Sequence, residues 1–112
     1  MPKVILSVFL AFVLCPLLTA GDVKVTIKEW DVPTPNPHPY GIASTSDGMV
    51  WYSESGVRPN TVVAFNPKAK SFQSWPIPSG GGVVRNMVAT PDDRLYLACS
   101  GVNKIAIVAV SH

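Results

Sequence analysis

A repeat of 45 residues constrains the fold more than any other feature of this sequence. Asp47 and Asp92 lie 45 positions apart, each within a turn-forming segment, 46–48 and 91–93. Short runs of apolar, aromatic and β-branched residues flank both segments, which is typical of a β-hairpin. A hairpin that returns with a period of this length indicates propeller-type blades, each a four-stranded sheet.

The strands expected outside the two hairpins show how the blades are built. They are predicted at residues 26–30, 61–65, 71–75 and 104–110, and the hairpins at 40–53 and 86–98. The chain then holds one strand, a full set of four, and three more. We therefore expect 26–30 to pair with 104–110 and close the second blade, which hides a sheet edge.

The predicted fold is all-β, with two four-stranded antiparallel propeller-type blades at about 31–75 and 76–110. This is a partial β-propeller, because propellers typically need four to eight blades to close a ring. Apolar runs such as 61–65 and 105–110 indicate strands that are covered on both faces. Three outcomes stay open: a fragment, self-association through exposed blade faces, or two sheets packed face to face.

The first 21 residues have the pattern of a secretory signal peptide. Lys3 precedes an apolar stretch, 4–14, and Thr19, Ala20 and Gly21 form a small-residue exit. We expect a signal helix that is cleaved, a folded part at 22–112, and a secreted or periplasmic product. The alternative is an uncleaved leader that anchors the chain in a membrane.

Charge and cysteine content exclude some classes of function. Residues 22–112 carry eight Lys or Arg and seven Asp or Glu, with no basic run, so nucleic acid is not an expected partner. Cys99 lies in an apolar strand and is expected to be a small core residue.

Trp30 and Trp75 are interpreted as blade-edge packing rather than a carbohydrate platform.

The residues also carry a resemblance to a known family. The segments at 39–43, 46–48 and 51–54, which read Pro-Tyr-Gly-Ile-Ala, Ser-Asp-Gly and Trp-Tyr-Ser-Glu, resemble the repeat of the virginiamycin B lyase (streptogramin lyase) family. The likeness covers roughly residues 26–110, and 51–110 is most similar to the last two blades of such a protein. The resemblance implies a seven-bladed propeller in the whole family member.

Counting outward from the turn centre at Asp47 places Tyr40 opposite Glu54, and the same count about Asp92 places Arg85 opposite Cys99. In the family that this chain resembles, a His stands at the position of Tyr40 and a Glu at the position of Glu54. There these residues hold Mg²⁺ and supply the base that opens a cyclic depsipeptide lactone by elimination. Here Tyr40 replaces the His, and only Glu54 matches.

Glu54, Tyr40 and Arg85 are therefore the candidate catalytic residues, with Glu54 the candidate Mg²⁺ ligand. We favour Glu54 as a rim residue that pairs with Arg58 or Arg85, and His38 as an exposed loop residue. The favoured function is an exported, lyase-like propeller fragment or binding module for an unknown small molecule or peptide. The alternatives are an Mg²⁺-dependent lyase after self-assembly, and a membrane-tethered interaction protein.

Overall fold

The computed structural model describes residues 21–111, which fall into two units divided between Trp30 and Asp31. The predicted signal helix falls on residues 1–20 and lies outside the described part. Residues 21–30 contain neither helix nor strand. No helix within residues 21–111 is long and apolar enough to cross a membrane.

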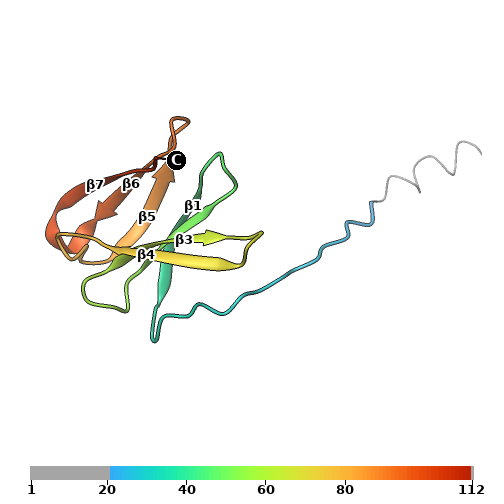
Figure 1. Cartoon of the computed structure of the whole chain (residues 1–112), viewed down its shortest axis with the longest axis horizontal. Coiled ribbons are helices and arrows are strands. Elements are labelled where there is room, and N and C mark those ends of the chain that lie inside the picture. The colour runs from blue at the N-terminus through green and yellow to red at the C-terminus, as the bar shows by residue number, and fades with distance from the viewer. Residues whose placement is uncertain (1–20, 112) are drawn as a thin grey trace, which may run out of the picture. The chain divides into compact units, whose positions relative to one another are not determined.

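The second unit consists of two antiparallel sheets, so the all-β prediction is confirmed (Figure 1). Sheet A has the strand order β1-β2-β3-β4, and sheet B has the order β5-β6-β7. The strands are β1 (Pro39–Ser44), β2 (Val50–Glu54), β3 (Thr61–Asn66), β4 (Ser71–Pro76), β5 (Val84–Ala89), β6 (Arg94–Cys99) and β7 (Lys104–Ala109). A short 3₁₀ turn, η1 (Ser100–Val102), joins β6 to β7.

The prediction that residues 26–30 form a strand that closes the second blade is wrong, because these residues contain no strand. Sheet B has three strands, with β7 at its edge. Val23, Val25 and Ile27 alternate with polar residues, as in a strand, but their exposed fractions are 83%, 73% and 80%. Alternation of side chains does not supply the backbone hydrogen bonds of a neighbouring strand. Without such a partner, the segment has the pattern of a strand but not its structure.

The 45-residue repeat is present in the backbone as well as in the sequence. Ala43 pairs with Trp51 in sheet A, and Val88 pairs with Tyr96 in sheet B, so both members of the pair shift by 45. Gly48 (φ 86°) and Asp93 (φ 60°) occupy the same left-handed turn position, which an aspartate tolerates better than most side chains. The two hairpins therefore share one register about their turns, as predicted.

The core lies between the sheets. Trp51 of β2 and Val62 and Ala64 of β3 form one side of it. The other side is a set of buried residues from sheet B: Val84, Met87, Leu95, Leu97 and Cys99. Leu95 and Leu97 are at most 1% exposed, and burying a side chain of this size contributes roughly 1.5–3 kcal/mol.

Two polar connections fix how the sheets sit on each other. The Ser53 hydroxyl accepts a hydrogen bond from the Gly41 amide (3.0 Å) and donates one to the Val84 carbonyl of sheet B (2.7 Å). At the turns, the Asp93 carboxylate accepts hydrogen bonds from the Ser46 amide (2.9 Å) and hydroxyl (2.5 Å). The inner strands β1 and β5 consequently pack against each other.

Candidate binding groove and the buried glutamate

A groove of about 610 Å³ opens between the outer strands of the two sheets. Strands β3 and β4 form one wall, and β7 forms the other. The side chains on the walls are mostly apolar, and Asp47 is the one charged residue among the described residues that line the groove. These residues are Asp47, Met49, Trp51, Val62, Ala64, Gln73, Trp75, Pro76, Ile77, Pro78, Leu97, Ala106, Ile107, Val108, Ala109, Val110 and Ser111. Its volume is within the range of small-molecule sites.

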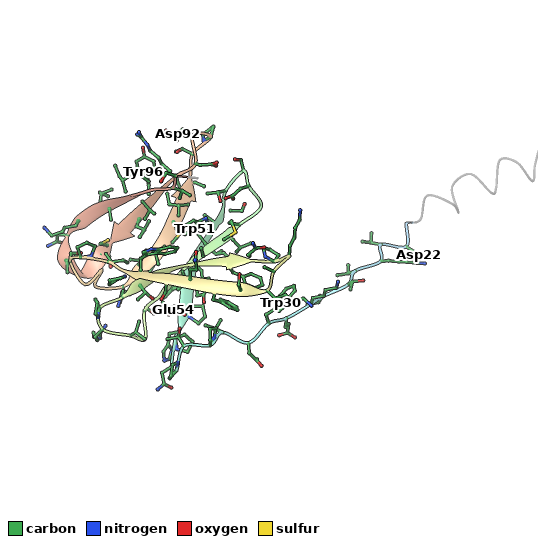
Figure 2. All side chains as sticks on the ribbon, viewed as in Figure 1. Asp22, Trp30, Trp51, Glu54, Asp92 and Tyr96 are labelled. Atoms are coloured by element: carbon green, nitrogen blue, oxygen red, sulfur yellow. The ribbon has the colours of Figure 1, made fainter. Side chains whose placement is uncertain are left out.

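Two tryptophans form an aromatic surface in this groove. The rings of Trp51 and Trp75 stack with their centroids 5.6 Å apart and an angle of 26° between their planes. Trp51, which Figure 2 labels, is buried. Its indole N–H donates to the Thr45 hydroxyl at 3.0 Å, which fixes the ring. Trp75 is 43% exposed, so it presents a free part of its ring toward the groove.

The groove is not predicted from the sequence. Trp30 and Trp75 are interpreted there as blade-edge packing, because they lie at equivalent strand ends, 45 residues apart. The pairing of β3 with both β2 and β4 brings the rings of Trp51 and Trp75 to the same face, since Ser53 pairs with Val62 and Val62 with Trp75. Predicting the groove would require the apolar positions of three strands to be aligned with one another, which needs the register of their pairing.

The structure places the predicted site residues differently from the expected arrangement. Glu54 pairs with Pro39, and a β-bulge sets Tyr40 and Gly41 opposite the single residue Ser53. A bulge of this kind shifts the alternation of side chains by one position. Tyr40 is 54% exposed and Glu54 only 1% exposed, so the prediction that they face each other as rim neighbours is wrong.

The second hairpin has the same bulge, so the predicted pairing of Arg85 with Cys99 is also wrong by one position. Cys99 pairs with Val84, and Arg85 is exposed. Cys99 is buried with a free thiol, as expected for a core residue, and burial raises the pKa of that thiol. His38 is an exposed loop residue, as predicted.

Glu54 is a buried polar residue inside sheet A (Figure 2). One carboxylate oxygen accepts a hydrogen bond from the Tyr52 hydroxyl, and the other accepts one from the Thr61 hydroxyl, both at 3.1 Å. The predicted pairing with Arg58 or Arg85 is therefore replaced by two hydroxyl donors on β2 and β3. This arrangement compensates for removing the side chain from water.

The residues present do not fit the Mg²⁺ that the family resemblance implies. Both oxygens of Glu54 are engaged by hydroxyl groups, and residues 21–111 contain no group of three or more His, Cys, Asp or Glu side chains that could hold a metal ion. Mg²⁺ favours octahedral coordination by carboxylates, other oxygens and water, which this enclosed pair does not offer.

The Tyr52 hydroxyl gives a prediction for alkaline pH. Burial, and then the neighbouring Glu54, raise the pKa of Tyr52 above its ordinary value of 10.0. The folded state holds the proton where the unfolded chain loses it, so this contribution to stability is complete below pH 10 and is lost above it. We expect the free energy of unfolding to fall by up to about 1.4 kcal/mol per pH unit above 10.

Denaturant unfolding at pH 9 and pH 11 measures this effect when the native chain is compared with Tyr52→Phe. The variant should show a smaller loss between the two pH values, because it has no proton to release at this site. An equal loss in both proteins would contradict the assignment to Tyr52.

Comparison with models of known protein families and with curated proteins finds no match to this sequence.

Proposed function

We propose that this chain is an exported, non-catalytic binding module built as two propeller-type blades, similar to part of a virginiamycin B lyase. The common register of the two hairpins, the shared bulge and the packing of β1 on β5 support the blade interpretation. Export rests on the leader pattern at residues 1–21.

The observation that carries the binding function is the groove with its stacked tryptophans. A pocket of this size, with apolar walls and few polar groups, suits a neutral ligand that is flat and aromatic or extended and apolar. Gln73 and Ser111 at the groove supply polar groups that can orient such a ligand. A strongly anionic ligand is disfavoured, because none of the lining residues within 21–111 is cationic.

The lyase alternative needs Glu54 as a base or metal ligand. Its burial and its two hydroxyl partners instead support a structural role. An assay for opening of a cyclic depsipeptide lactone, with and without Mg²⁺, separates the two hypotheses. We expect no opening by the native chain above that of Glu54→Gln.

Binding is tested with the neutral aromatic probe N-phenyl-1-naphthylamine, followed by tryptophan quenching and probe emission. We expect Trp75→Ala to weaken binding about tenfold, because an aromatic contact contributes about 0.5–1.5 kcal/mol beyond its buried area. Trp30→Ala is the matched control, because Trp30 is not a lining residue, and it should bind as the native chain does. Equal affinity in the native and Trp75→Ala proteins would exclude this groove as the site.

A further inference from the structure

The free edge of β7 is exposed in the groove. Strand β7 pairs with β6 on one side, and within residues 21–111 no strand pairs with its other side. The consecutive residues Ala106, Ile107, Val108 and Ala109 all line the groove. Because side chains of a strand alternate between its two faces, a groove that meets consecutive residues also meets the backbone between them. The amide and carbonyl groups of β7 that point away from β6 are therefore open to a ligand in the groove.

The other three edge strands have features that oppose pairing with a further strand. Strands β1 and β5 each contain a bulge, and they pack against each other. Strand β4 ends in Pro76, which has no amide hydrogen to donate. Strand β7 has no proline and no bulge in its pairing with β6, and its charged residue, Lys104, stands at its first position. Within the described part of the chain, β7 is thus the edge strand best suited to accept a partner strand.

The repeat shows what such a partner looks like. Trp51 of β2 pairs with Ala64 of β3, and Tyr96 of β6, 45 residues later, pairs with Ile107 of β7. Strand β7 is therefore the equivalent of β3. On the side away from β2, β3 pairs with the antiparallel strand β4 over its whole length. Sheet B has no strand at the equivalent position within residues 21–111.

We infer that the groove binds an extended peptide segment of another protein, which adds to β7 as an antiparallel fourth strand of sheet B. This inference rests on the proposed binding function of the groove and names the class of its ligand. Hydrogen bonds from the main chain of a peptide to a sheet edge supply affinity, and pockets for alternate side chains supply specificity. The volume of about 610 Å³ suits the side chains of one strand rather than a second sheet.

Register within the repeat predicts which side chain of the peptide enters the groove. Val108 is equivalent to Phe65, because the residues that they pair with are 45 positions apart. Phe65 pairs with Phe72 of β4, and their rings stack with centroids 4.7 Å apart. The Val108 side chain lies on the groove side of β7, and paired residues of neighbouring strands place their side chains on the same face. The peptide residue opposite Val108 should therefore be aromatic or large and apolar.

The test uses a synthetic peptide with the sequence of residues 70–76, which contains β4, labelled with fluorescein at its N-terminus. We expect fluorescence anisotropy to show saturable binding to the native chain, and the peptide to displace N-phenyl-1-naphthylamine. Two N-methylated forms are the matched controls, one methylated at Phe72 and Ser74 and the other at Gln73 and Trp75. Successive amides of a strand point to opposite sides, so one form should bind at least about tenfold more weakly, and the other as the unmodified peptide does.

Two further measurements locate the bound peptide. Amide hydrogen exchange should slow by at least about tenfold at alternate residues within 104–109 when the peptide is saturating, because these amides gain acceptors. In the peptide, Phe72→Asp should weaken binding at least about tenfold, since it carries a carboxylate into an apolar groove. Gln73→Asp adds the same charge on the opposite face of the strand and should bind as the unmodified peptide does.

Equal affinity of the two N-methylated forms would overturn the inference, because the contact would then not use the backbone of the peptide. Binding of N-phenyl-1-naphthylamine without binding of the peptide would also overturn it, and would leave the proposed function in place. If neither probe bound, the proposed function would fail as well. A native chain that is dimeric by light scattering and takes up no peptide would contradict the inference and assign the edge of β7 to a second copy.

Discussion

Glu54→Ala is expected to destabilise the fold by about 2–5 kcal/mol, since it removes a packed side chain and leaves two hydroxyl groups, one on a buried and one on a half-buried residue, without their acceptor. The carboxylate is 1% exposed and accepts hydrogen bonds from Tyr52 and Thr61. Glu54→Gln should cost only about 1 kcal/mol, because the amide keeps the shape and the hydroxyl groups can turn to accept from it. Equilibrium unfolding in urea measures both losses.

A double-mutant cycle identifies the cause of this loss. In a Tyr52→Phe background, Glu54→Ala leaves one unpaired hydroxyl group instead of two, so its cost should be smaller by about 1 kcal/mol. If the cost were the same in both backgrounds, the hydrogen bond between Tyr52 and Glu54 would not contribute to stability. A loss below about 0.5 kcal/mol for Glu54→Ala itself would argue that the carboxylate is solvated, as at a surface site.

Gly82→Ala is the second substitution with a large expected effect, about 3 kcal/mol or more, because it combines backbone strain with a steric overlap. Gly82 has a φ of 66°, and a Cβ atom added to it would lie 2.5 Å from the Cα atom of Gly101. The loop before β5 and the turn η1 after β6 cross here, backbone against backbone. The loops would have to move apart to admit one methyl group.

Gly80→Ala is the control that separates the two contributions. Gly80 has a φ of 89°, but no atom lies within 4 Å of its added Cβ. It should therefore show only the strain of the left-handed conformation, about 1–2 kcal/mol. Urea unfolding of the two variants side by side gives the cost of the overlap as their difference. Equal losses would mean that the loops separate freely.

The strands of the second unit could be predicted from the sequence because local signals agree with one another. Turn residues at Asp47 and Asp92 lie between apolar runs. Because the pattern occurs twice, each hairpin predicted from one copy is supported by the other copy. The number of strands in sheet B could not be predicted in the same way. Pairing of residues 26–30 depends on long-range contacts, and an alternating pattern is only a requirement for such contacts.

The candidate site depended on details that a single sequence does not contain. Counting from the turn assumes a regular ladder, and one extra residue in β1 places Pro39 instead of Tyr40 opposite Glu54. No residue type marks that bulge unambiguously, although Gly41 permits the close approach of β1 to Arg85 and Asn86 of β5. The second hairpin has the same extra residue, so Cys99 pairs with Val84 instead of Arg85.

The hydrogen bonds that join the sheets have a consequence for cooperativity. Ser53 connects them in the interior, and the Asp93 carboxylate connects them at the turns, by contact with Ser46. If one hairpin separated from the other, these groups and the whole apolar interior would be exposed together. Extended repeat arrays can lose repeats one at a time, because each repeat contacts only its neighbours. In this chain each sheet covers the core face of the other, so we expect the pair, and not the single repeat, to fold and unfold as one unit.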